Sequence, residues 1–182
     1  MLSKIWLIPL VFTILIVSSF GNAFAAVDYF LKIEGVDGES TDSKHKGQIE
    51  IDSFSWGVSN SGAMASGGGG GAGKATFHDI HFTTHVSKAS PKLMQAAATG
   101  EHLKTFDLTV RKAGGTQMDY YIVHLEDVLV SSYSSSGSSG EVPMESVSFN
   151  YQKIVFEYIP TNADGTAAEA VKASWNLATN TR

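Results

Sequence analysis

Apolar and polar residues alternate along most of the chain, and this pattern predicts mainly extended structure. The first alternating run is residues 27–33, whose apolar members include Val27, Tyr29, Leu31 and Ile33. A period of two is typical of a strand that buries one face. Further runs lie at residues 49–58, 75–86, 106–110, 118–132 and 147–158. In the last run the apolar positions shift from odd to even numbers near Gln152 and Lys153, which indicates a β-bulge where the strand bends between sheets.

One short helix is predicted between two stretches of extended structure. Ser90 can cap its N-terminus, and Pro91 suits its first turn. Gly100 is placed to end the helix, because glycine adopts the left-handed conformation at little cost. Many strands with one helix predict a mainly β fold, a compact antiparallel β-barrel of two sheets with one flanking short α-helix. We assign the barrel domain to residues 26–160 and a polar C-terminal tail of the same domain to residues 161–182.

Long loops are predicted where the alternation stops. Residues 37–48 contain no apolar side chain, residues 59–73 are rich in glycine, and residues 131–140 are rich in serine. Residues 68–74 match the first part of a phosphate-binding loop, G-x-x-x-x-G-K. Ala75 follows where a hydroxyl would hold Mg²⁺, and a strand pattern replaces the helix that would receive the phosphate. We therefore expect a connecting or contact loop and no nucleotide site.

Residues 1–25 predict a secretory signal peptide. Lys4 is their only charge, an apolar run extends from Ile5 to Val17, and small residues frame a cleavage site at Ala23-Phe24-Ala25. This run is shorter than the roughly 18–20 residues that a bilayer span needs, so a permanent anchor is the alternative interpretation. We expect passage through the periplasm, a secreted product and no stable membrane anchoring after cleavage.

Composition and charge exclude several other classes of protein. The chain has no cysteine, which removes disulfides, thiolate metal sites and cysteine nucleophiles. Without the predicted signal peptide it carries 12 basic and 18 acidic residues. This negative balance argues against nucleic acid or anionic lipid as a partner.

Candidate catalytic and metal-binding groups do not form a recognisable set. His78, His81 and His85 have the spacing of a helical metal site, but extended structure would place His78 opposite the other two. No serine lies in a G-x-S-x-G motif, and the neighbouring carboxylates of Glu126 and Asp127 would point to opposite sides of a strand. We expect no catalytic residue, no metal ligand, no cofactor and no enzyme activity.

Small side chains cover one face of the run at residues 49–58. The odd-numbered residues Ile51, Ser53, Ser55 and Gly57 share this face, and the last three of them are small. Phe54 and Trp56 lie on the opposite face. An ordinary solvent-exposed face and a surface shared with a partner or a lumen both fit this pattern.

Taken together, several segments resemble the haemolysin-coregulated protein (Hcp) family, the inner-tube subunits of type VI secretion systems. The matching stretches are AVDYFLKIEGVDGES at 26–40, IEIDSFSWGVSNSG at 49–62, GGGGGAGKA at 67–75, SKASPKLMQAAATGEH at 87–102, LTVRKAGG at 108–115, LEDVLVSSYSSSGSSGE at 125–141 and VSFNYQKIVFEY at 147–158. The resemblance implies a β-barrel like that of phage tail-tube proteins. It also implies homohexameric rings that stack into a hollow tube, a contracting sheath, a spike and effectors in the lumen.

On this resemblance, Ser53 and Ser55 are candidates to face the lumen. The candidates for ring contacts lie in the two long loops and are Asp42, Lys44, His45, Gly68, Gly70 and Lys74. Expected partners are further copies of the chain, spike, sheath and effector proteins, with no nucleic acid. The predicted signal peptide departs from the family pattern, because family tubes assemble in the cytoplasm. The alternative is a Sec-exported, ring-forming binding module that does not act in an injection tube.

Overall fold

The computed structural model describes residues 26–60, 75–113 and 117–182. The predicted signal peptide at 1–25 and the loop candidates Gly68, Gly70 and Lys74 lie outside the described residues. The strands are β1 (Val27–Ile33), β2 (Ile49–Glu50), β3 (Ser53–Ser55), β4 (Val58–Asn60), β5 (Ala75–Phe77), β6 (Ile80–His85), β7 (His102–Lys112), β8 (Asp119–Ser136), β9 (Met144–Tyr158) and β10 (Val171–Asn176), and the helix is α1 (Ser90–Thr99). In these ranges no helix has the length and apolarity needed to cross a membrane.

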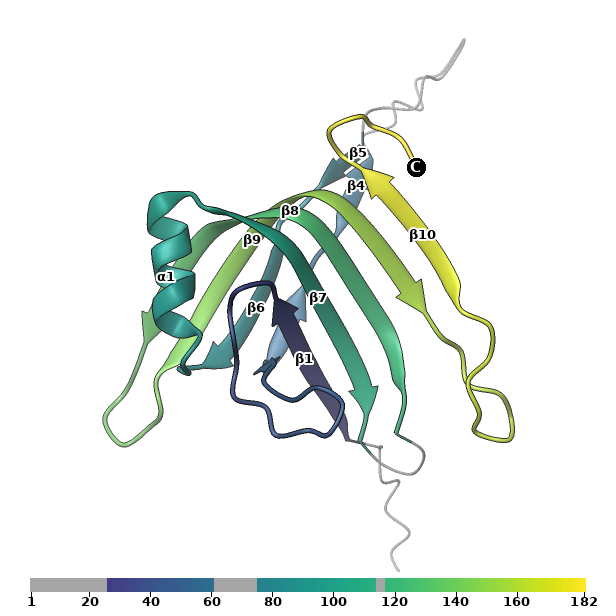
Figure 1. Cartoon of the computed structure of the whole chain (residues 1–182), viewed down its shortest axis with the longest axis horizontal. Coiled ribbons are helices and arrows are strands. Elements are labelled where there is room, and N and C mark those ends of the chain that lie inside the picture. The colour runs from purple at the N-terminus through teal and green to yellow at the C-terminus, as the bar shows by residue number, and fades with distance from the viewer. Residues whose placement is uncertain (1–25, 61–74, 114–116) are drawn as a thin grey trace, which may run out of the picture.

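Most strands form one curled antiparallel sheet (Figure 1), in the order β2-β1-β7-β8-β9-β6-β3, with β10 added to β9. Its two ends, β2 and β3, are successive parts of residues 49–55. The N–H of Ile51 donates to the carbonyl of Tyr29 on β1 (3.1 Å), and the N–H of Asp52 donates to the carbonyl of Thr83 on β6 (2.8 Å). This segment therefore bridges β1 and β6 and closes the curl of the sheet. The predicted mainly β barrel with one flanking helix is confirmed.

The inner face of the curled sheet holds the hydrophobic core. Phe149 lies at its centre, with its ring centroid 5.6 Å from that of Phe82 and 5.1 Å from that of Phe106. Leu93 and Ala96 of α1 join the same core, and α1 packs against β8. Each large apolar side chain buried in this way contributes about 1.5–3 kcal/mol. The core fixes which face of each strand remains outside.

The helix ends as predicted but begins differently. Gly100 has φ of 68° and its N–H donates to the carbonyl of Ala96 (3.0 Å), so the predicted C-terminal glycine is confirmed. Ala89 is the N-cap residue, without a side-chain hydrogen bond. Ser90 instead accepts the N–H of Ser87 on its Oγ (2.9 Å), which turns the chain before the helix starts. The prediction of Ser90 as the N-cap was wrong.

Two predicted strands are divided, and two predicted loops are partly strand, since β4 includes Ser59 and Asn60 of the glycine-rich segment. Residues 49–58 form β2, β3 and the start of β4, because the chain crosses from β1 to β6 within this run. Residues 75–86 divide into β5 and β6. The serine-rich segment at 131–140 continues β8 as far as Ser136, paired with Met144 of β9. Backbone hydrogen bonds can extend a strand beyond its apolar side chains.

The change of buried face in β9 lies where the sequence predicts it, but no register shift accompanies it. Asp127 of β8, with φ of 52°, lies between the pairs Glu126–Lys153 and Val128–Tyr151, whose register is continuous. Both strands exchange their buried and exposed faces there. The register shift in this pair lies between Val130 and Ser132. The predicted bulge near Gln152 and Lys153 was therefore misplaced.

The segment at residues 161–182, predicted as a tail, contains β10. This strand pairs with the second half of β9, whereas β6 pairs with the first half. Trp175 of β10 stacks on Phe77 of β5, with ring centroids 6.4 Å apart. The C-terminal segment thus covers the part of β9 that β6 does not reach.

Candidate functional site

Two rows of small polar side chains cross β3, β6, β9 and β8 on the outer face of the curled sheet. We call these eight side chains the hydroxyl face: Ser53, Thr83, Ser146 and Ser134 in one row, and Ser55, His81, Ser148 and Ser132 in the other. The four strands turn their apolar residues to the core, among them the fully buried Phe82 and Phe149. Strand alternation therefore builds a polar face directly above the core.

Ser53 and Ser55, the predicted lumen candidates, are exposed members of the hydroxyl face. Ile51, expected on the same face, is only 6% exposed. The chain crosses from β1 to β6 between Ile51 and Asp52, so the alternation of β3 does not extend back to Ile51. That part of the prediction was wrong.

The side chains of the hydroxyl face bond to one another along the sheet. The hydroxyls of Ser53 and Thr83 are 2.7 Å apart. The His81 ring lies between two serines, with Nδ1 3.1 Å from Ser148 Oγ and Nε2 3.3 Å from Ser146 Oγ. Apart from His81 these side chains are short, and together they offer hydroxyl donors and acceptors on the outer face.

A buried acid lies beneath this face. Glu145 of β9 is 2% exposed, and the hydroxyl of Tyr133 on β8 donates to its Oε1 (2.5 Å). Burial and this hydrogen bond raise the pKa of Tyr133 to about 12. Glu145 is in phase with the buried Val147 and Phe149 of β9, and extending this alternation by one step is the sequence signal that could have identified it as buried.

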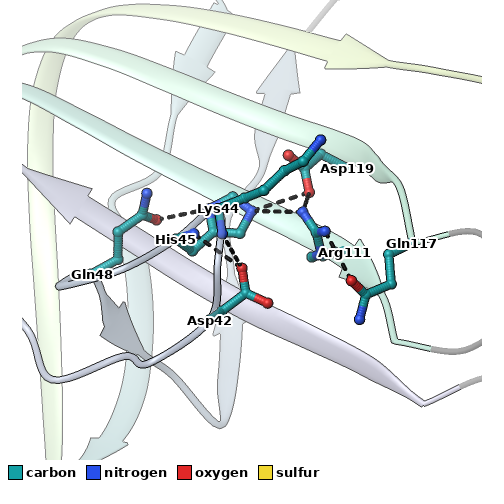
Figure 2. A network of polar contacts seen from close by, with 7 residues as sticks. All are labelled: Asp42, Lys44, His45, Gln48, Arg111, Gln117 and Asp119. Atoms are coloured by element: carbon teal, nitrogen blue, oxygen red, sulfur yellow. Dashed lines mark hydrogen bonds and ion pairs between the residues drawn. The ribbon is translucent and has the colours of Figure 1, made fainter.

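The loop at residues 37–48 is fastened to the sheet by a polar network, shown in Figure 2. We call this network the loop clamp; its members are Asp42, His45, Gln48, Arg111, Gln117 and Asp119. His45 is 5% exposed, and its ring stacks on Phe30 with centroids 4.3 Å apart. Its Nδ1 lies 3.2 Å from Gln48 Oε1 and its Nε2 lies 3.1 Å from Asp119 Oδ1.

Arg111 of β7 forms the other half of the loop clamp. The side chain is 3% exposed, with Nη1 donating to Asp119 Oδ1 (3.0 Å) and Nη2 donating to Gln117 Oε1 (3.1 Å). One carboxylate oxygen of Asp119 thus receives contacts from both Arg111 and His45. The arginine charge is balanced within the subunit, and the loop is joined to both β7 and β8.

The predicted ring-contact residues of this loop occupy different environments. Asp42 Oδ1 accepts the backbone N–H groups of Lys44 (2.8 Å) and His45 (3.0 Å). The hydrogen bond from the backbone N–H of Lys44 lowers the pKa of the Asp42 carboxyl group, and the bond from His45 adds a smaller effect in the same direction. Lys44 is exposed, whereas the His45 ring is buried in the loop clamp. Asp42 and His45 therefore shape the loop, and Lys44 projects from it.

The three histidines that suggested a metal site each have a separate partner. His78 Nε2 lies 3.3 Å from Ser59 Oγ, and His85 Nδ1 lies 3.1 Å from Asp52 Oδ2. His81 is held by serines in the hydroxyl face. In the ranges that the structure describes, no three histidine or acidic side chains converge on a point where a metal could bind.

The fold is that of a class of type VI secretion proteins. A solved structure of a type VI secretion system protein shares 37% of its sequence with this chain and superposes with a TM-score of 0.81, covering 85% of this chain and 98% of the solved one. The chain belongs to the Hcp family: the family model for "Type VI secretion system effector, Hcp" matches residues 30–158. The resemblance seen in the sequence is thereby confirmed.

Named relatives support the same family. Protein hcp1 of Pseudomonas aeruginosa is 45% identical over 158 residues, which span 85% of this chain and 98% of the relative. The crystal structure of Hcp1 from Salmonella typhimurium is 31% identical and has a TM-score of 0.72, covering 86% of this chain and 98% of that protein. Both similarities extend over nearly the whole length of the relative.

Proposed function

We propose that this chain is a tube-like subunit of a type VI secretion system. Six copies form a ring, rings stack into a hollow tube, and the tube carries effectors and is secreted. The hydroxyl face, which includes Ser53 and Ser55, lines the lumen. The observation that carries this proposal is the continuity of small polar side chains across four neighbouring strands, which suits a surface along which different protein cargoes must slide.

Loop contacts between subunits or rings form the second part of the proposal. The loop clamp holds residues 37–48 against the sheet, so that Lys44 is presented in a fixed position. Asp42 and His45 stabilise this loop through their hydrogen bonds. Gly68, Gly70 and Lys74 belong to the other predicted contact loop. When neighbouring subunits contact each other through two different surfaces, the assembly closes into a ring if the rotation from one subunit to the next returns to the first subunit.

The expected partners follow from this role. They are further copies of the chain, the spike and sheath of a type VI system, and effector proteins. The excess of acidic over basic residues opposes nucleic-acid binding. No reaction is assigned to the chain, and the proposal requires neither a catalytic residue nor a cofactor.

The predicted signal peptide favours a second candidate function. A Sec-exported subunit would form rings outside the cytoplasm, where a cytoplasmic sheath cannot reach them. It would then act as a ring-shaped binding module. Intact mass and light scattering on protein from each cell fraction separate the two: full-length hexamers in the cytoplasm support the tube, and periplasmic or secreted hexamers beginning at Ala26 support the exported module.

Replacement of Ser55 tests the lumen assignment. Ser55→Trp places a bulky ring on the hydroxyl face, and Ser138→Trp makes the same change in an exposed loop outside it. We expect both variants to remain hexamers by light scattering, while only Ser55→Trp loses effector proteins that are co-expressed and co-purified with the ring. Equal cargo retention by the two variants would contradict the assignment.

A further inference from the structure

His81 is the one titratable side chain among the eight residues of the hydroxyl face. Its neighbours across the sheet are Ser55 on one side and Ser148 on the other. The remaining members are serines and one threonine, which stay neutral at all relevant pH values. A change in the protonation of His81 therefore changes the charge of the face.

The hydrogen bonds of His81 allow both charge states. Its two ring nitrogens contact Ser148 Oγ (3.1 Å) and Ser146 Oγ (3.3 Å). A serine hydroxyl can donate to an unprotonated ring nitrogen or accept from a protonated one. A proton can thus be added to the ring while both contacts persist, with the serine hydroxyls rotating to suit.

The other charged groups near His81 are Asp79, the pair of His85 and Asp52, and the buried Glu145. Asp79, two residues earlier on the same face of the chain, accepts from Ser131 Oγ (2.5 Å) and Asn150 Nδ2 (3.0 Å). His85, further along β6, pairs with Asp52 at the start of β3 (3.1 Å). On β9 the nearest acid is Glu145, which is buried on the opposite side and bonded to Tyr133 of β8. The parts of β3, β6, β8 and β9 that form the hydroxyl face contain no lysine or arginine.

We propose that His81 sets the charge selectivity of the hydroxyl face. With the ring neutral, Asp79 gives this surface a negative potential that disfavours acidic cargo. Protonation of the ring adds a positive charge among the hydroxyls and favours acidic segments. This inference rests on the proposed role of the face as the cargo surface, and it makes cargo retention dependent on pH.

Binding of labelled peptides to the assembled protein tests the proposal. The probes are a peptide of alternating serine and glutamate and a matched peptide with glutamine in place of glutamate. We expect the acidic peptide to bind at least about fivefold more tightly at about pH 5.5 than at about pH 8, the effect of one partly screened charge. The glutamine peptide should bind equally at both.

Variants assign that effect to a single residue. His81→Ser should abolish the pH dependence, and His81→Lys should keep tight binding of the acidic peptide at both pH values. His102→Ser is the control, because His102 is an exposed histidine paired with Asp127 on β8 (2.6 Å), away from the hydroxyl face. It should behave as the unmodified protein does.

The outcomes distinguish this inference from the proposed function. Peptide binding that Ser55→Trp blocks, but that His81→Ser leaves with unchanged pH dependence, overturns the role of His81 and leaves the cargo surface standing. Peptide binding that neither variant alters overturns both. Absence of any binding of the acidic peptide to the unmodified ring at about pH 5.5 also overturns the inference.

Discussion

Arg111 and Asp119 lie directly opposite one another on β7 and β8, joined by a hydrogen bond of 3.0 Å between Nη1 and Oδ1. A register shift between Val110 and Arg111 produces this pairing, because the pairs before it follow a different alignment. His45 reaches the same carboxylate oxygen from the loop at residues 37–48. An irregularity in the sheet thus creates the anchor for a loop far away in the sequence.

Removal of the arginine should destabilise the subunit. Arg111→Ala leaves Gln117 without its donor and Asp119 with only its contact to His45, and we expect a loss of about 2–4 kcal/mol in the free energy of unfolding. Urea denaturation followed by tryptophan fluorescence measures the loss. Lys104→Ala is the matched control, because Lys104 pairs with Glu34 in an exposed salt bridge and should cost at most about 1 kcal/mol. Equal losses in the two variants would contradict the importance of the loop clamp.

The loop should detach when the histidine of the loop clamp is lost. His45→Ala removes the stacking on Phe30 and the contacts to Gln48 and Asp119, while the core around Phe149 stays intact. We expect faster hydrogen exchange of amides in residues 37–48 and a shift from hexamer to smaller species in light scattering. His102→Ala should change neither. A stable hexamer of His45→Ala would argue against this loop as a ring contact.

Glu145, buried beneath the hydroxyl face, accepts a hydrogen bond from the hydroxyl group of Tyr133. Tyr133→Phe leaves Glu145 buried without its donor, and this should cost about 1–3 kcal/mol of stability. Adding Glu145→Gln removes the buried charge, so the double variant should recover part of the loss. Tyr158→Phe, at a residue that is 45% exposed, should be neutral in the same denaturation experiment. A double variant that is less stable by the full sum of the single losses would show that the two side chains are not coupled.

Stability should fall at alkaline pH through two tyrosines. Burial raises the pKa of Tyr151 to about 12, with Asp79 adding to the effect, and burial and Glu145 do the same for Tyr133. An unfolded tyrosine ionises near pH 10, so this stabilisation is complete below about pH 10 and is lost as the pH rises to about 12. Urea unfolding at several pH values should show this decline, and Tyr151→Phe should make it shallower. An unchanged slope in that variant would contradict the account.

Local patterns in the sequence predicted the elements that depend on neighbouring residues. Alternation located β1, the middle of β7 and most of β8 and β9, and glycine chemistry located the end of α1 at Gly100. The polar exposure of Ser53 and Ser55 also followed from alternation alone. These features are set by the strand period and by backbone sterics, which are visible along a single segment.

Features that depend on distant segments were not predictable in this way. His45 and Arg111 are 66 residues apart, and neither has a local signal that identifies the other as its neighbour. The division of residues 49–58 follows from two different sheet partners, and the extension of β8 to Ser136 follows from pairing with β9. In each case the pairing of the chain overrides side-chain propensity.

The accessibility of a single cysteine at position 55 tests the central claim most directly. The chain has no cysteine of its own, so Ser55→Cys and Gln95→Cys, on the exposed surface of α1, each carry one thiol. In stacked rings, a small maleimide should label both positions, whereas a polymer-linked maleimide too large to enter the lumen should label only position 95. In dissociated subunits the large reagent should label both. Equal labelling of both positions by the large reagent in the stacked rings would contradict a lumen lined by the hydroxyl face.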